Sequence, residues 1–284
     1  MINYEVSSYK SKRKPSWCPG CGNYSVLNAL HKVLAAKNIK PHESAVISGI
    51  GCSSRFPFFM STYGFHTIHG RALPVAIGLK QARTDVNVIA VGGDGDGLSI
   101  GGNHFIHAAR KNPNIVYIMM DNEIYALTKG QCSPTSRIGT VTKCNPYAWT
   151  ADRINPVLMA LSFNASYVAR GYSGDIKQLE ELITGGLNHK GFAFIHVMSP
   201  CVQYNKVSSF EKIKEIIKSI PEDHCVSDRL NAMKFAFDDS GLYTGLFYKI
   251  EKPTYEERYQ DVINKSKEII AKDFSINDVI KQFT

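Results

Sequence analysis

The sequence lacks several features that would place it in a specialised class of protein. No apolar run among its 284 residues reaches the roughly 18–20 residues that span a bilayer. Its first residues contain no apolar stretch like that of a secretory signal. Seven cysteines are too sparse in a chain of this length for the disulfide framework of a small secreted domain. These absences predict a cytoplasmic protein without a membrane span, whose cysteines are available for metal or redox chemistry.

The composition is that of an ordinary globular protein, with 44% hydrophobic and 20% charged residues. A formal net charge of +8 is compatible with nucleic acid, a membrane surface or an acidic protein as partner. The basic residues are scattered, however, apart from a run at residues 10–14, and no basic stripe with interleaved aromatic residues is present. We therefore expect no nucleic-acid or membrane binding. Residues 10–14 are interpreted as a solvated arm or, alternatively, as a docking patch for an acidic partner.

The order of apolar patterns along the chain predicts an α/β fold. Short apolar runs alternate with stretches in which apolar residues recur at helical spacing. This alternation indicates a mostly parallel sheet with helices on both faces. Ligands bind at the carboxyl ends of the strands in such sheets. The predicted strands cover residues 45–48, 86–91, 115–120, 165–169 and 192–197, and the predicted helices cover residues 25–36, 73–82, 104–110 and 175–187.

The character of the chain changes after residue 204. Residues 208–220 have the pattern of an amphipathic helix and residues 255–270 are also helix-like, but the segments around them are charged and weakly patterned. We therefore predict two parts. Residues 1–204 form an α/β domain that holds the cofactors, and residues 205–284 form a C-terminal helical extension or arm.

Four cysteines have the surroundings of metal ligands. Cys18 and Cys21 lie in W-C-P-G-C-G, where proline and glycine give a tight turn, Cys52 lies in G-I-G-C-S-S, and Cys201 follows a predicted strand in S-P-C-V. Four thiolates suit an iron–sulfur cluster or zinc. The spacing does not match the usual zinc ribbon, but ligand chemistry alone leaves an iron–sulfur cluster, zinc and unmetallated structural or redox cysteines as alternatives.

A second set of residues suggests a diphosphate and magnesium site. Asp94, in Gly93-Asp94-Gly95, ends a predicted strand, and Asn122 ends another. Small residues allow backbone N–H groups to approach phosphate oxygens closely. A carboxylate, an amide and a main-chain carbonyl can hold Mg²⁺ together with diphosphate oxygens, which makes Asp94, Asn122 and Ile124 the candidate ligands. G-D-G by itself occurs in many turns, but its combination with a following helix, strand and Asp-Asn is far more specific.

Residues 15–205 resemble the β subunits of the 2-oxoacid:ferredoxin oxidoreductases, which bind thiamine diphosphate. The resemblance rests on W-C-P-G-C-G-N, G-I-G-C-S-S-R, H-T-I-H-G-R-A, G-G-D-G-D-G-L-S-I-G-G-N-H, D-N-E-I-Y-A-L-T-K-G-Q, S-P-T-S and S-P-C-V, and is greatest for the 2-oxoglutarate members. It implies a [4Fe-4S] cluster on Cys18, Cys21, Cys52 and Cys201, and Mg²⁺ on Asp94, Asn122 and Ile124. It implies contacts with thiamine diphosphate from Ile50, Gly51, Cys52, Ser53, His69, Gly95, Asp96, Ala126, Leu127 and Thr128.

The resemblance also assigns two residues to catalysis. Arg55 takes the position of a basic residue that recognises the substrate, and its guanidinium could hold the distal carboxylate of a dicarboxylic 2-oxoacid. An ordinary ion pair with a nearby acid or with a partner subunit is the alternative for Arg55. His69, which precedes Gly70-Arg71, is expected to contact the cofactor.

The activity that the resemblance implies is the reversible oxidative decarboxylation of 2-oxoglutarate. Coenzyme A takes up the succinyl group, CO₂ leaves, and the electrons pass through the cluster to ferredoxin. A pyruvate or branched-chain 2-oxoacid enzyme, or a zinc-stabilised non-catalytic module, is the alternative. The chain has no glutamate in a motif that would place it against the aminopyrimidine ring, and the family carries that residue on its α subunit. We therefore expect an inactive single chain that functions in a heterodimer or heterotetramer with an α subunit.

Overall fold

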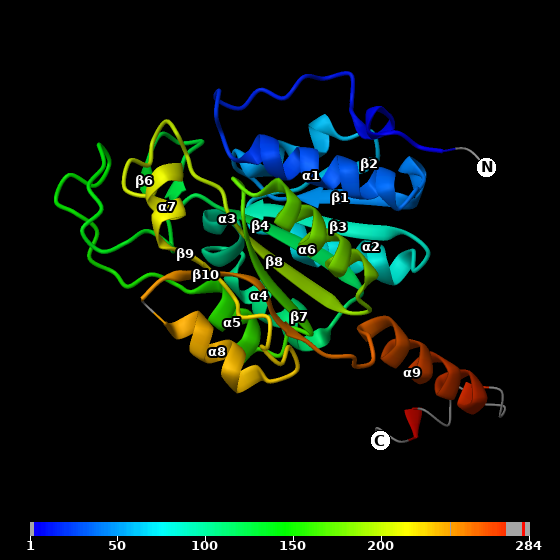
Figure 1. Ribbon diagram of the computed structural model, residues 1–284. Helices are drawn as coiled ribbons and strands as arrows, with labels where there is room; N and C mark the ends of the chain where they lie inside the picture. The colour runs from blue at the N-terminus through cyan, green and yellow to red at the C-terminus, as the bar shows by residue number, and fades with distance from the viewer. Residues whose placement is uncertain (1–2, 239, 271–279, 282–284) are drawn as a thin grey trace.

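The computed structural model describes residues 3–238, 240–270 and 280–281. Its centre is an eight-stranded sheet with the order β2-β1-β3-β4-β8-β7-β10-β9 (Figure 1). Neighbouring strands are parallel except β7 and β10, which pair antiparallel. The predicted α/β fold with a mostly parallel sheet is confirmed. The strands are β1 (Ser44–Ser48), β2 (Tyr63–His66), β3 (Asn87–Gly93), β4 (Ile115–Asp121), β7 (Tyr167–Tyr172), β8 (Phe192–Met198), β9 (Ile217–Ser219) and β10 (Leu242–Lys249).

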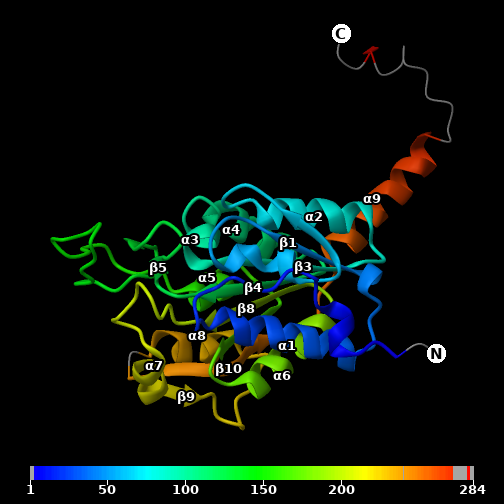
Figure 2. The ribbon, with the colours of Figure 1, turned by 90° about the horizontal axis from the view of Figure 1, so that it is seen from above.

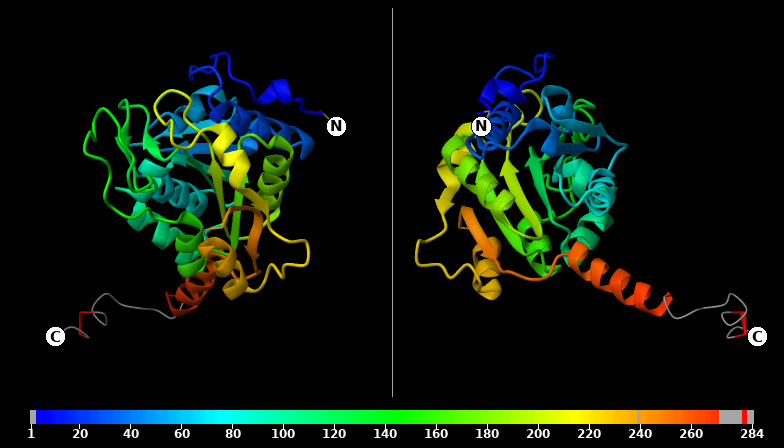
Figure 3. Two further views of the ribbon diagram at one scale, coloured as in Figure 1. Left: turned by 60° about the vertical axis from the view of Figure 1, so that its left-hand side comes forward. Right: turned by 90° about the vertical axis from the view of Figure 1, so that its right-hand side faces the viewer.

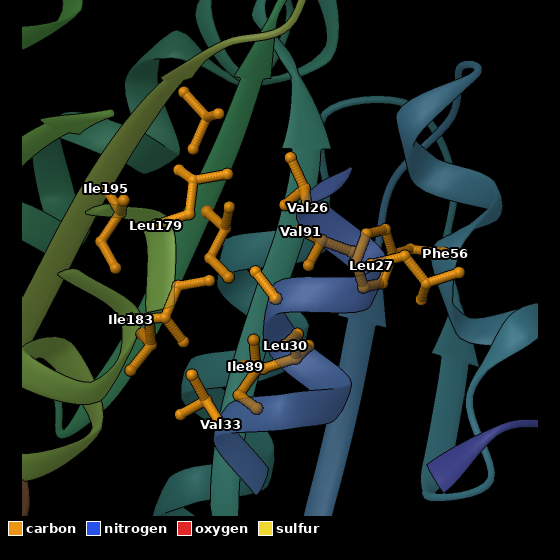
Figure 4. Packing of buried hydrophobic residues seen from close by; sticks show 14 of the residues in the cluster. Val26, Leu27, Leu30, Val33, Phe56, Ile89, Val91, Leu179, Ile183 and Ile195 are labelled. Atoms are coloured by element: carbon orange, nitrogen blue, oxygen red, sulfur yellow. The ribbon is translucent and has the colours of Figure 1, made fainter. Parts of the chain in front are cut away.

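Helices cover both faces of the sheet, as Figure 2 shows for α1 and α2. One face packs against α1 (Asn23–Ala36) and α6 (Ile176–Asn188). Side chains of these two helices interdigitate with the apolar residues of β3 and β8 (Figure 4). Helices on the other face are α2 (Ala72–Ala82), α4 (Gly102–Lys111), α5 (Pro156–Ser162) and α8 (Arg229–Phe237).

The central strands owe their position to largely apolar sequence. Every residue of β4 and of β8 is buried, because helices cover these strands on both sides. The outermost strand β2 has four exposed residues, in agreement with its place at the edge. No helix in the described part of the chain is long and apolar enough to cross a membrane.

The sheet continues beyond the predicted boundary at residue 204. The segment predicted as one helix over residues 208–220 is α7 (Phe210–Ile216) followed directly by β9, and β10 pairs with β7. The helical extension expected here therefore contributes two strands. The expectation missed them because their pairing partners lie far away in the sequence. Helix α9 (Tyr255–Ile270) matches its predicted range and projects from the body of the molecule (Figure 3).

Several shorter elements accompany the central sheet and its helices. The sequence motifs follow β1, β3, β4 and β8 at the carboxyl edge of the sheet. The G-D-G segment, expected at the end of a strand, spans the end of β3 and the start of the short helix α3 (Asp94–Leu98). The remaining short elements are the 3₁₀ helices η1 (Val6–Tyr9), η2 (Pro41–Glu43) and η3 (Ser53–Phe59) and the strands β5 (Ile124–Tyr125) and β6 (Gln131–Cys132), which pair with each other.

Candidate active site

A cavity of about 220 Å³ opens at the carboxyl ends of β1, β3 and β4. It brings together all ten residues predicted to contact the cofactor and all three predicted magnesium ligands. Gly93 and Tyr125, which were not among the predicted contacts, also line it. The complete lining consists of Ile50, Gly51, Cys52, Ser53, His69, Gly93, Asp94, Gly95, Asp96, Asn122, Ile124, Tyr125, Ala126, Leu127 and Thr128.

Asp96 fastens two loops of this cavity together. Its Oδ1 accepts hydrogen bonds from the backbone N–H groups of Ile50 (2.9 Å) and Gly70 (2.7 Å). Nδ1 of His69 lies 3.0 Å from the same oxygen. Burial raises the pKa of Asp96, and the two amides and His69 oppose the rise. The residue before Ile50 has to be glycine, because a Cβ at Gly49 would lie 2.1 Å from Oδ2 of Asp96.

The predicted magnesium ligands line the same cavity. Asp94 is 2% exposed; its Oδ1 accepts a hydrogen bond from the Asn122 N–H (3.4 Å) and its Oδ2 one from Oγ1 of Thr135 (2.8 Å). Burial, followed by the charge of Asp121, raises the pKa of Asp94 to about 8. A buried carboxylate beside an amide oxygen is a donor set that suits Mg²⁺, whose charge would compensate that of Asp94. The residues present therefore fit a magnesium ion.

Behind Asp94 lies a buried polar chain that the sequence interpretation missed. Oγ1 of Thr135 is 2.8 Å from Oδ1 of Asp121 as well as from Asp94. Oδ2 of Asp121 is 2.9 Å from Nε2 of His196, and Nε of Arg170 donates to Nδ1 of His196 (3.1 Å). Polar residues within the apolar strands β4, β7 and β8 were the sequence signal that could have revealed this chain.

The contacts of this polar chain define the protonation of the histidine. Because Arg170 donates to Nδ1, the neutral ring of His196 carries its proton on Nε2 and directs it to Asp121. Burial lowers the pKa of His196, which agrees with a neutral ring. Burial would raise the pKa of Asp121, but the hydrogen bonds from His196, from the Glu123 N–H and from Thr135 outweigh it and lower the pKa. Asp121 is thus a stable carboxylate. Its Oδ1 and Oδ2 of Asp94 both lie within hydrogen-bond distance of the Thr135 hydroxyl.

A second cavity, of about 200 Å³, contains the four predicted cluster cysteines. Cys18 is exposed, Cys21 and Cys52 are half-buried, and Cys201 is buried. Burial and the other three thiols raise the pKa of Cys21 to about 12. Within residues 3–238, 240–270 and 280–281, no three His, Cys, Asp or Glu side chains form a group that could hold a metal ion. The fold nevertheless gathers the four thiols around one cavity, and four thiolates are the ligands of an iron–sulfur cluster, which is larger than a single ion.

Trp17 closes one side of this second cavity. Its indole Nε1 donates to the backbone carbonyl of Cys52 (2.6 Å), and its ring packs against Tyr24, Phe56 and Phe59. On another side, the Tyr204 N–H donates to Sγ of Cys201 (3.4 Å). Amide hydrogen bonds and apolar cover of this kind tune the properties of sulfur ligands.

Arg55 lines the second cavity beside the cysteines. Its positive charge acts to lower the pKa of Cys52, although burial raises that pKa overall. Arg55 forms no salt bridge with an acid of the described chain, so an ordinary intrachain ion pair does not account for it. The guanidinium therefore remains available for an anion in the second cavity or for an acid of a partner subunit.

The two cavities share a wall, formed by Cys52, Asn122, Ala126 and Leu127.

Residues 49–197 match the family model of the thiamine pyrophosphate enzyme, C-terminal TPP binding domain. Residues 201–264 match the family model of the C-terminal part of the pyruvate ferredoxin oxidoreductase beta subunit. Fold and cavity thus define a thiamine diphosphate-binding enzyme of the oxidoreductase class.

Individual relatives narrow the class. A 2-oxoacid:ferredoxin oxidoreductase subunit beta of Aeropyrum pernix is 41% identical over 271 residues, which cover 91% of this chain and 85% of that one. The 2-oxoglutarate oxidoreductase subunit KorB of Mycobacterium tuberculosis is 44% identical over 73% of this chain, which spans only 55% of that relative. The solved 2-oxoglutarate:ferredoxin oxidoreductase of Magnetococcus marinus superimposes with a TM-score of 0.92 at 41% identity, covering 100% of this chain and 97% of that one. The chain belongs to the β subunits of the 2-oxoacid:ferredoxin oxidoreductases.

Proposed function

We propose that this chain is the cofactor-binding subunit of a complex that converts 2-oxoglutarate and coenzyme A reversibly into succinyl-CoA and CO₂. The electrons would leave through a [4Fe-4S] cluster to a ferredoxin. The single observation that carries the proposal is the shared wall between the cofactor cavity and the four-cysteine cavity. In the proposed reaction this wall would separate the electron source from the electron acceptor within one chain.

The first cavity would hold magnesium and thiamine diphosphate. Asp94, Asn122 and the carbonyl of Ile124 would bind Mg²⁺, while Gly95 leaves room for phosphate oxygens beside the backbone. Thiamine diphosphate, when bound, supplies the carbanion chemistry that decarboxylation of a 2-oxoacid requires. Asp96 keeps His69 in the cavity wall, where the imidazole would contact the cofactor.

The second cavity would hold the cluster and part of the substrate. Cys18, Cys21, Cys52 and Cys201 would be the thiolate ligands, and Trp17 would exclude water from one side. Arg55 would bind the distal carboxylate of 2-oxoglutarate bidentately, because a planar guanidinium matches a carboxylate. A substrate carboxylate explains why Arg55 faces the cavity without an acidic partner.

Completion of the site would require a companion α subunit. No glutamate of the described chain lines either cavity, although ylid formation needs a carboxylate at the aminopyrimidine ring. We therefore place the active site at an interface in a cytoplasmic heterodimer or heterotetramer.

The test is to co-express the chain with its companion subunit and to assay viologen reduction with 2-oxoglutarate, pyruvate and branched-chain 2-oxoacids. We expect a brown complex with about four iron atoms per chain and a preference for 2-oxoglutarate. Cys21→Ser should lose iron, whereas Cys225→Ser, at an exposed cysteine outside the cavity, should keep it. A colourless complex with stoichiometric zinc would refute the redox function, and a preference for pyruvate would refute the substrate.

A further inference from the structure

The basic segment at residues 10–14 is a fixed part of the molecular surface. The hydroxyl of Tyr9, just before it, is buried and donates to the carbonyl of Leu34 (3.0 Å). Lys10 forms a β-bridge with Met60, and the Ser11 hydroxyl donates to the carbonyl of Phe58 (2.7 Å). These contacts hold the segment along η3, so its charges occupy defined positions.

The charges of this segment face solvent and are not neutralised within the described chain. Four of the five residues, Lys10, Lys12, Arg13 and Lys14, are basic, and all four are exposed. None of them forms a salt bridge with a described acid. The guanidinium of Arg13 lies 5.1 Å from the ring centre of Phe58, which is itself 38% exposed. The segment therefore presents a basic surface with an aromatic side chain within it.

This surface leads directly to the four-cysteine cavity. Ser16, Trp17 and Cys18, which come shortly after Lys14 in the chain, line that cavity. Cys18 is the exposed one among its four cysteines. In Figure 1 the N-terminal segment passes over α1 and reaches the first turn of that helix, where the cysteine turn lies. The basic surface thus borders the point at which the cavity meets solvent.

We propose that residues 10–14 and the rim at Cys18 form the docking surface for an acidic electron-carrier protein. The inference rests on the proposed function, since it takes the four-cysteine cavity as the exit for electrons. A basic patch attracts an acidic protein and orients it during encounter, and here the orientation would bring the carrier's redox centre to the exposed thiolate. The exposed aromatic side chain of Phe58 favours a protein over a simple polyanion, because aromatic residues are enriched in protein interfaces.

The test uses the assembled complex with the double variant Lys12→Glu/Lys14→Glu. We expect the KM for an acidic ferredoxin to rise about tenfold, with a weaker dependence of the rate on salt. Viologen-linked turnover with 2-oxoglutarate should stay unchanged, because neither lysine lines the cofactor cavity or the four-cysteine cavity. The neutral variant Lys12→Gln/Lys14→Gln should show a smaller rise in KM in the same direction.

The matched control is Lys190→Glu/Lys249→Glu, which changes the net charge by the same amount. Lys190 precedes β8 and Lys249 pairs with the first residue of β7, so both lie at the amino edge of these strands, away from Cys201. An equal rise in KM in this control, or no rise in the Lys12/Lys14 variants, would overturn the docking surface. Binding of the wild type to anionic vesicles or DNA that the Lys12/Lys14 variants lose, with unchanged ferredoxin kinetics, would also overturn it. Absence of viologen reduction in the wild type would instead refute the proposed function.

Discussion

Thr135→Val should weaken the binding of Mg²⁺ and thiamine diphosphate although Thr135 does not line the cofactor cavity. The hydroxyl lies 2.8 Å from an oxygen of Asp94 and 2.8 Å from an oxygen of Asp121. Its hydrogen bond stabilises the ionised form of Asp94, and magnesium needs that form as a ligand. Valine has nearly the same shape but cannot donate, so two buried carboxylates would face each other without a donor between them.

The expected loss of Mg²⁺ affinity follows from the number of hydrogen bonds that the substitution removes. A hydroxyl has one hydrogen, so it donates to one carboxylate at a time and the loss is counted once. A hydrogen bond to a charged group contributes roughly 1.5–3 kcal/mol, which corresponds to about a 10- to 150-fold weaker affinity for Mg²⁺.

The assay is a Mg²⁺ titration of the complex after dialysis against EDTA, at saturating thiamine diphosphate, followed by activity and by intrinsic fluorescence. Thr135→Ser retains the hydroxyl and should restore most of the affinity. Thr244→Val is the matched control, because Thr244 is 2% exposed and bonded to Gln178 but lies in β10. Wild-type affinity in Thr135→Val, or equal defects in the valine and serine variants, would refute the reasoning.

Three further changes test other parts of the site and fold. Gly95→Ala should abolish saturation with thiamine diphosphate, because its Cβ would lie 2.3 Å from a ring carbon of Tyr125 within the cofactor cavity. His31→Gln should reduce the loss of thermal stability below pH 6.5. Burial lowers the pKa of His31 to about 4. The stability that the fold gains with a neutral imidazole at this position is therefore complete above about pH 6.5. It is lost as the pH falls toward 4, by at most about 3 kcal/mol. Trp17→Phe should shorten the half-life of the cluster absorbance in air severalfold, since it removes the donor to the Cys52 carbonyl.

Each of these changes has a control in the same chain. Gly102→Ala should retain cofactor saturation, because no atom lies within 4 Å of its added Cβ, and an equal defect there would contradict the steric argument. His42→Gln, at an exposed position, should leave the pH profile of stability unchanged, and a profile for His31→Gln parallel to wild type would contradict the burial argument. Trp149→Phe, outside the four-cysteine cavity, should leave the cluster as stable as in wild type.

Local sequence patterns predicted most of the strands and helices in the first two hundred residues. The continuous apolar run at residues 115–120 became β4, and the helical spacing over residues 25–36 became most of α1. Because carboxyl ends of parallel strands share one edge of a sheet, the placement of motifs after strands was enough to predict that Asp94, Asn122 and Cys52 meet. They line one cavity in the structure.

The sequence did not predict structural features that depend on residues far away in the chain. β10, with the sequence L-Y-T-G-L-F-Y-K, has apolar residues without regular alternation and is interrupted by a glycine, and its antiparallel pairing with β7 decides its conformation. Thr135 stands in S-P-T-S, one of the motifs that carry the resemblance, but the resemblance assigned no role to this threonine. Its role follows from its contacts with Asp94 and Asp121, which come from two different strands.

The amino-acid sequence by itself determined which groups this protein can offer as ligands, namely four thiols, a carboxylate and an amide, and the alternating fold that carries them to one edge. The tertiary structure decided how these groups are coupled. It gave the two cavities a common wall of Cys52, Asn122, Ala126 and Leu127. It also placed the buried hydroxyl of Thr135 where it donates a hydrogen bond to Asp94. The physical reason is that ligand types are a property of single residues, whereas shared walls and buried hydrogen bonds arise only when strands far apart in the chain pack together.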